Sequence, residues 1–222
     1  GKYKITKGFS NNDIINVLRS GQQTPTLVVF NNQHSLEELS GRVAEQIEAD
    51  SISILNAMTD VVFLEKNQFT LKSALGMYVP NSYEFYWNTT AEQFRDRMYI
   101  EYNRFWNEKR ENEAKKLNLS RTKVIALASI VQKETAKISE RPIVAGLYLN
   151  RLKRGWPLQA DPTIIYALKE KHGKDFMVKR VLKKDLKINS PYNTYKNKGI
   201  PPTLIAMPDI SSIDAVLFSK KK

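Results

Sequence analysis

The chain has 222 residues, a formal net charge of +12 and no cysteine. This length fits one large domain or two small ones, and the 41% hydrophobic content is sufficient for a core. The lack of cysteine excludes a thiol nucleophile, a thiolate metal site and a disulfide framework. The positive charge favours anionic partners or solubility, and no nucleic-acid signature accompanies it. No apolar run approaches the ~18–20 residues of a membrane-spanning helix.

The first fifty residues predict a small α+β module. A helix is expected over 12–18 after an Asn-Asp cap, and the apolar run 26–30 is typical of a strand. Ser35, with Glu38 three residues later, forms a capping-box pattern. That pattern predicts a second helix, which reaches about residue 49.

The next segment, 51–119, predicts a connecting helical region. Short helices are expected near 52–59 and 70–74. The aromatic stretch YVPNSYEFYW (78–87) either packs between modules or lines a groove, and packing is favoured because aromatic rings supply core area more often than ligand contacts. A second capping box begins at Thr90 and predicts one helix that extends to about residue 116.

Glu134 ends a helix that Ser120 is expected to cap. Leu127, Ile130 and Val131 precede it at the spacing of one helix face, so its carboxyl is predicted to lie on an apolar stripe. Burial would raise the pKa of that carboxyl, and an acid still protonated near neutral pH suits general acid catalysis. A solvated glutamate at a helix end is the commoner alternative from position alone.

A loop follows the helix expected over 141–154, for which Gly155 suits the C′ position. In this loop, Asp161 and Pro162 are typical of a helix start, with an aspartate N-cap and a proline at the first helical position. Gln159 precedes them beside a turn. Its amide could bind a sugar hydroxyl or satisfy the loop backbone.

A second polar loop is SPYNTY (190–195), followed by GIPP (199–202). Tyr192 and Tyr195 flank Asn193, which brings ring faces and hydrogen-bonding groups together. Carbohydrate sites use this combination because a pyranose has an apolar face and a polar rim. A rigid loop in which the tyrosines only pack is the alternative, and these residues alone favour it.

Other kinds of site lack support. His34 and His172 are far apart and have no partner at metal-ligand spacing, so no metal site is expected. No glycine-rich phosphate loop is present, and Ser129 lies within a predicted helix without a nucleophile-elbow setting. Acid catalysis by a carboxyl group remains as the predicted chemistry, with no cofactor.

Ordered motifs over about residues 120–217 identify a family. They are LASIVQKET (127–135), ERP (140–142), VAG (144–146), NRL (150–152), LQADPT (158–163), YNTY (192–195) and GIPP (199–202). With them the chain resembles the endolytic murein transglycosylases of the MltG (YceG-like) family. The first half is similar more weakly: GKY and LRSG near the N-terminus resemble the later part of that family's LysM-like module. YEFYWNT (83–89) resembles versions from Bacteroidetes-type bacteria.

The resemblance implies an α+β fold, with a small LysM-like module followed by a mostly helical catalytic domain with short strands. The expected division is a partial LysM-like module at 1–50, a connecting helical region at 51–119 and a YceG-like catalytic domain at 120–222. That domain is expected to be C-terminally truncated, because relatives continue beyond Leu217 with a His- and Asn-containing segment. The resemblance also implies a single-pass anchor in the inner membrane, absent from this chain, and a periplasmic catalytic domain.

The resemblance implies cleavage of the glycosidic bond between N-acetylmuramic acid and N-acetylglucosamine in nascent peptidoglycan, leaving 1,6-anhydro ends. The catalytic glutamate falls on Glu134, as general acid and then base. One carboxylate suffices because the substrate's own C6 hydroxyl is the nucleophile, and Gln132 stands where many members have a second glutamate. The substrate-binding residues are expected to be Gln159, Asp161, Tyr192, Asn193 and Tyr195.

The implied partners are peptidoglycan glycan strands, with cell-wall synthases as neighbours. The alternative function is a non-catalytic peptidoglycan-binding or scaffold protein on the same fold. Retention of Glu134 and both loops favours the enzyme, while the shortened C-terminal part favours the scaffold. Nucleic-acid binding rests on charge alone and is not expected.

Overall fold

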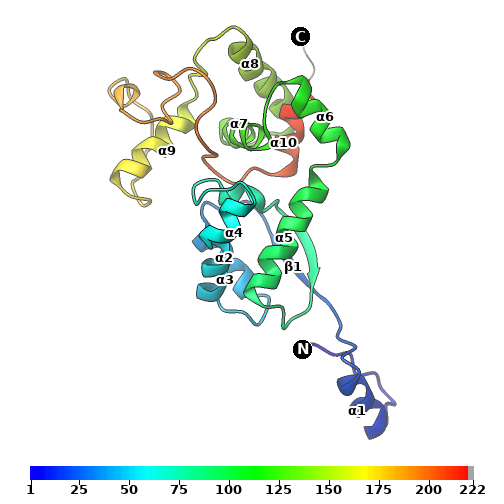
Figure 1. Ribbon diagram of the computed structural model, residues 1–222. Helices are drawn as coiled ribbons and strands as arrows, with labels where there is room; N and C mark the ends of the chain where they lie inside the picture. The colour runs from blue at the N-terminus through cyan, green and yellow to red at the C-terminus, as the bar shows by residue number, and fades with distance from the viewer. Residues whose placement is uncertain (220–222) are drawn as a thin grey trace.

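The computed structural model describes residues 1–219 and shows a mostly helical α+β chain (Figure 1). The elements of the first half are α1 (Asn11–Arg19), β1 (Thr26–Phe30), α2 (Leu36–Ala44), α3 (Ser51–Met58), α4 (Val61–Lys66), the 3-10 turn η1 (Ala74–Met77), β2 (Asn81–Phe85) and α5 (Ala91–Phe105). Those of the second half are α6 (Glu108–Lys116), α7 (Arg121–Glu134), η2 (Ile138–Glu140), α8 (Arg141–Lys153), α9 (Asp161–His172), η3 (Asp185–Lys187) and α10 (Ile210–Leu217). Residues 220–222, part of the expected catalytic domain, lie outside the described residues.

Helix α1 lies apart from the rest of the chain, at the end of an extended segment (Figure 1), and none of its residues is buried. Its N-cap is Ser10, so the cap predicted at residues 12–13 is wrong. Ser10 Oγ accepts the backbone N–H of Asp13, and the Asp13 carboxylate accepts the backbone N–H of Ser10 at 2.8 Å. The LysM-like identity of this region stays a prediction.

The predicted strand at 26–30 is confirmed as β1, and it pairs antiparallel with β2. Thr26 lies opposite Phe85, and Phe30 opposite Asn81. Val28 and Phe30 are buried while Leu27 between them is exposed, which is the alternation of a sheet with one covered face. The pairing joins a strand from before residue 50 to one from after it, so the sheet crosses the expected domain boundary.

The aromatic stretch at 78–87 contributes to the core beneath this sheet. Tyr78 stacks on Phe94 with ring centroids 6.2 Å apart, and Phe85 meets the same ring at 5.2 Å. The packing interpretation is confirmed for Tyr78 and Phe85, which are both buried. Tyr86 and Trp87 remain exposed.

The single helix predicted over 90–116 is two helices. The capping box at Thr90 is confirmed, but α5 ends at Phe105, and Asn107 starts α6 by accepting the backbone N–H of Arg110 at 3.1 Å. Trp106 turns the chain between them and is buried at the corner. Burial of this large ring, together with a new N-cap, favours a bend over a continuous helix.

Helix α7 lies at the centre of the second half of the chain, with α8, α9 and α10 around it (Figure 1). Its N-cap is Ser120, as predicted, and its residues are buried from Val124 through Val131. Because neighbours cover the helix on several sides, its position is fixed by packing. The direction in which Glu134 leaves its C-terminal end is therefore fixed as well.

Candidate active site

Glu134 is the last residue of α7, and its side chain is exposed. Thr135 leaves the helix in an extended conformation. The burial predicted for Glu134 from the apolar stripe is therefore wrong. Helical periodicity indicates the covered face only while the helix continues, and here the helix ends at the residue in question.

A buried tyrosine holds one oxygen of Glu134. Tyr148 of α8 donates from Oη to Glu134 Oε2 at 3.1 Å, and its side chain is 2% exposed. Burial raises the pKa of Tyr148 well above its ordinary value, and the adjacent Glu134 carboxylate adds to the rise. The phenol therefore stays protonated as a donor. Among residues 1–219, Glu134 Oε1 accepts no hydrogen bond, which leaves this oxygen free for a substrate.

Thr194 joins the two loops that the sequence singled out. Its carbonyl accepts the backbone N–H of Gln159 at 3.0 Å, and its Oγ1 accepts that of Ala160 at 3.0 Å. Thr163 on α9 shares a hydroxyl hydrogen bond of 2.8 Å with the same Oγ1. Gln159 has a φ of 52° and an exposed side chain. Its backbone N–H binds the second loop, whereas its side-chain amide makes no hydrogen bond within residues 1–219.

Asp161 and Tyr195 bring the two loops together through their side chains. Tyr195 Oη donates to Asp161 Oδ1. Partial burial, this hydrogen bond and the nearby charges of Asp161 and Glu134 raise the pKa of Tyr195 to about 12. The Glu134 charge raises the pKa of both Tyr148 and Tyr195, so Glu134, both tyrosines and Asp161 form one polar cluster.

The predicted capping role of Asp161 is wrong by one position. Ala160 is the N-cap of α9, no side chain caps it, and Asp161 is the first helical residue. Pro162 lies in the first turn, as expected. Because Asp161 does not bind the helix N-terminus, its carboxylate is available to Tyr195.

Asn193 supports its loop from within. Its side chain is 0% exposed. Nδ2 donates to the carbonyls of Leu186 and Ile188 at 3.0 and 2.8 Å, and Oδ1 accepts the backbone N–H of Tyr195 at 3.0 Å. The sugar contact expected of Asn193 has no support here, because the main chain uses both ends of its amide.

Tyr192 is buried as well, at 1% exposure. Its ring lies tilted against Tyr166 at 4.6 Å, and its hydroxyl shares a 2.6 Å hydrogen bond with Thr203. The side chain therefore packs the loop against α9. Of the five expected substrate-binding residues, Gln159 and Asp161 are exposed and Tyr195 is partly so.

Gln132 ties the last described segment to α7. Its Nε2 donates to the Met207 carbonyl at 3.3 Å, and its Oε1 accepts the backbone N–H of Asp209 at 2.6 Å. Arg141 of α8 donates to both carboxylate oxygens of Asp209 at 2.7 and 2.8 Å. The amide at position 132 thus uses a donor and an acceptor together, which a glutamate could not do when ionised.

Within residues 1–219, no three His, Asp or Glu side chains come close enough to hold a metal ion. In the same part of the chain, none of the helices is both long enough and apolar enough to cross a bilayer.

The sequence matches the YceG-like family across residues 1–222. The chain belongs to the YceG-like family. It is 31% identical over a 236-residue alignment to an endolytic murein transglycosylase of Bacillus subtilis (strain 168), and 27% identical over 248 residues to one of Streptococcus pneumoniae serotype 2. Both alignments cover all of this chain, which spans 64% of the length of the first relative and 44% of the second.

A crystal structure of a YceG-like protein from Listeria monocytogenes is similar to this fold, with a TM-score of 0.71 and 28% sequence identity. The match covers 99% of this chain and 76% of that one. The family that the motifs indicated is confirmed. The Bacteroidetes-type origin stays a prediction that these relatives do not test.

Three residues of this YceG-like site were not predicted from the sequence: Tyr148, Arg151 and Thr194. Tyr148 lies 14 positions from Glu134 on the next helix, and no local pattern relates the two. Arg151 donates to the Leu158 carbonyl, which fixes the first loop to α8, and its charge opposes the rise in the pKa of Tyr148 and Tyr195. Thr194 lies within the YNTY motif, and its hydroxyl between two tyrosines is the sequence signal that could have indicated a role in the site.

Tyr148→Phe is expected to lower kcat about ten- to a hundredfold, because a hydrogen bond to a charged group contributes about 1.5–3 kcal/mol. KM should change little, since the buried phenol positions Glu134 and leaves the sugar contacts to exposed residues. Initial rates against glycan concentration measure both constants. Tyr78→Phe is the matched control, because the Tyr78 hydroxyl is buried and has no hydrogen-bond partner within residues 1–219. Equal kcat in the two variants would remove the positioning role.

Asn193→Ala is expected to destabilise the protein by about 2 kcal/mol, because two carbonyls and a backbone N–H lose their buried partner. Thermal unfolding measures the effect. Asn189→Ala is the control, since Asn189 is exposed in the same region. An unchanged unfolding temperature together with a raised KM would instead support the prediction that Asn193 contacts the sugar.

Proposed function

We propose that this chain is the catalytic part of an endolytic lytic transglycosylase that cleaves the bond between N-acetylmuramic acid and N-acetylglucosamine in peptidoglycan. The observation that carries the proposal is the state of Glu134. Tyr148 holds one of its oxygens at 3.1 Å, and the other accepts no hydrogen bond within residues 1–219. The charge of Glu134 acts on Tyr195, which joins the loops at 159–163 and 190–195 through Asp161. The curated relatives named endolytic murein transglycosylase support the same chemistry.

In the proposed reaction, Glu134 acts twice. Its acid form gives a proton to the glycosidic oxygen as the bond to C1 breaks, and the new chain end leaves as an alcohol. The resulting carboxylate then takes the proton of the muramyl C6 hydroxyl, whose oxygen bonds to C1 and closes the 1,6-anhydro ring. Atoms and charge balance without added water. A second protein carboxylate as nucleophile, which retaining glycosidases use, is not required.

The neighbouring residues have separate proposed roles. Tyr148 orients the Glu134 carboxyl, so that its free oxygen faces the substrate. Gln159 and Asp161 are exposed at the mouth of the first loop and are the proposed contacts for hydroxyl or N-acetyl groups. Tyr195 holds Asp161 in place. Tyr192 and Asn193 support the second loop from within.

The proposal includes a cell-wall location for the whole protein, outside the cytoplasm. In more detail, we propose a single-pass protein of the inner membrane with a periplasmic catalytic domain. Cell-wall synthases are its proposed neighbours, and both points rest on the family resemblance. The division into 1–50, 51–119 and 120–222 is likewise proposed, as regions of the sequence of which the first two share the β1–β2 sheet. Membrane fractionation of cells, with protease added outside, tests the location: protein recovered in the cytosolic fraction would contradict it.

Product analysis of the chain tests the reaction. Uncrosslinked glycan strands are incubated with the protein and the new ends are identified by mass spectrometry. The proposal expects 1,6-anhydro-muramyl ends that lack one water relative to a reducing end. Reducing ends would indicate a hydrolase. Strand binding without cleavage would favour the alternative, a non-catalytic peptidoglycan-binding scaffold.

A further inference from the structure

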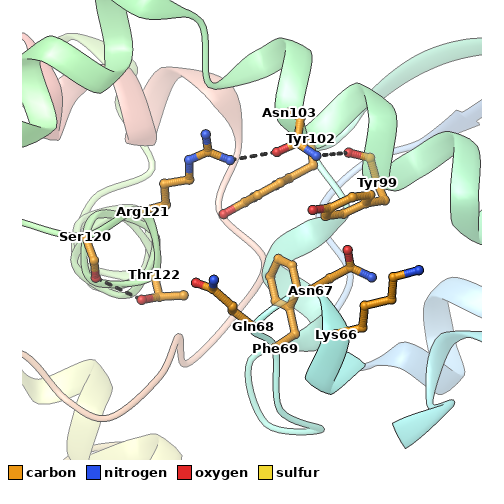
Figure 2. A pocket seen from close by; sticks show the side chains of 10 residues that line it. All are labelled: Lys66, Asn67, Gln68, Phe69, Tyr99, Tyr102, Asn103, Ser120, Arg121 and Thr122. Atoms are coloured by element: carbon orange, nitrogen blue, oxygen red, sulfur yellow. Dashed lines mark hydrogen bonds between the residues drawn. The ribbon is translucent and has the colours of Figure 1, made fainter. Parts of the chain in front are cut away.

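A cavity of about 440 Å³ lies at the other end of α7 from Glu134 (Figure 2). Three segments form it: the turn after α4, one face of α5 and the first residues of α7. Arg121 at its rim and Glu134 are the two ends of α7. With a rise of about 1.5 Å per residue, these ends are roughly 20 Å apart. The cavity is therefore separate from the candidate active site, and its volume lies within the range of small-ligand pockets.

Gln68, which lines this cavity, has a left-handed backbone conformation that is unusual for a residue other than glycine. It follows the C-cap Asn67 of α4 and has a φ of 62°. The next residue closes the helix, because Phe69 N donates to the Leu64 carbonyl at 2.8 Å. Glycine is the residue that this position favours. The chain has a glutamine instead, and its exposed amide makes no hydrogen bond to residues 1–219.

Aromatic rings and amides line the same space. Phe69 and Tyr102 meet edge to face at 5.4 Å, and Tyr99 adds a partly exposed ring (Figure 2). Asn103 donates to the Tyr99 carbonyl at 3.0 Å and accepts from Arg121 at 2.8 Å. Phe69 and Tyr102 are buried, so the Tyr99 ring is the open one, and a ring with polar groups around it matches a sugar, which has an apolar face and a rim of hydroxyls.

The charge of the lining residues is positive. None of the ten is Asp or Glu, whereas Lys66 and Arg121 are cations. Arg121 is paired with Glu111, which lies outside the lining. Lys66 forms no ion pair within residues 1–219 and is exposed. A carboxylate on the ligand would therefore meet an unpaired ammonium group at the rim.

We propose that this cavity binds a saccharide unit that carries a carboxylate, at a second site apart from Glu134. The identity of the ligand rests on the proposed function, because the muramic acid of peptidoglycan has a free lactyl carboxylate wherever its stem peptide has been removed. Occupation of this site holds a strand on the enzyme at a distance from the bond that is cut.

Calorimetric titration of the Glu134→Gln chain with an N-acetylglucosamine–N-acetylmuramic acid disaccharide tests the site. Gln68→Gly relieves the left-handed backbone, so the unfolding temperature is expected to stay equal or rise while affinity falls at least tenfold. Asn118→Gly is the matched control: Asn118 has a φ of 56° after the C-cap of α6 and lies outside the cavity lining. Its affinity is expected to stay unchanged.

Lys66→Gln tests whether the Lys66 charge, rather than the shape of the cavity, contributes to binding of the acidic ligand. It is expected to weaken the acidic disaccharide severalfold and to leave neutral diacetylchitobiose unaffected. Unchanged affinity in Gln68→Gly, or NMR shifts confined to the loops at 159–163 and 190–195, would overturn the proposal. Binding that depends on Gln68, together with a wild-type chain that makes no anhydro ends, supports this site and contradicts only the proposed reaction.

Discussion

Glu134→Gln is expected to lower the formation of 1,6-anhydro ends by about 10²–10⁴-fold, the usual contribution of general acid–base catalysis. Glutamine keeps the shape of the side chain, and its carbonyl can still accept the hydrogen bond from Tyr148. It cannot give a proton to the glycosidic oxygen or remove one from the C6 hydroxyl. Mass spectrometry of products from uncrosslinked strands measures the change.

Glu48→Gln is the control for this variant. Glu48 is exposed and its side chain makes no hydrogen bond or ion pair within residues 1–219, so its replacement should leave the product yield unchanged. Anhydro ends formed at the normal rate by Glu134→Gln would remove Glu134 from the reaction. Loss of activity in both variants would point to a general effect of charge.

Asp209→Asn is expected to destabilise the protein by about 3 kcal/mol, because Arg141 is buried and would lose the charge of its half-buried partner. The Arg141 side chain is only 7% exposed, and its Nε is buried without a hydrogen-bond partner in the described part of the chain. At roughly 2–4 °C per kcal/mol for a chain of this size, Tm should fall by roughly 6–12 °C. Calorimetry measures this fall. Glu113→Gln is the control: Glu113 is as exposed as Asp209, but its partner Lys116 is solvent-exposed, so the change should cost less than about 1 kcal/mol.

The same ion pair predicts a pH dependence. Burial works to raise the pKa of Asp209, but hydrogen bonds from the Ser212 backbone, Arg141 and Ser211 outweigh it and hold the pKa below its usual range. A carboxyl whose pKa is lower in the folded state stabilises the fold above its unfolded pKa of about 3.8, and this contribution is lost as pH falls through the folded pKa. The stability difference between wild type and Asp209→Asn should therefore shrink below about pH 4. A constant difference down to pH 2 would contradict this account.

Local signals predicted much of the fold. The strand at 26–30 and the caps at Ser35, Thr90 and Ser120 are where the sequence placed them, because each depends on residues within about four positions. The bend between α5 and α6 was not predicted. It depends on burial of Trp106, whose ring lies under Arg121 of α7, and periodicity contains no information about that contact.

The candidate site divides in the same way. The sequence by itself predicted the helix that ends at Glu134, the two polar loops and the family, because these depend on residue identity and order. The tertiary structure decided that Glu134 is exposed, that Tyr148 holds it and that Asn193 is buried. Each of these follows from packing between segments that are distant in sequence, and such packing determines which polar groups retain water and which must bond to the chain.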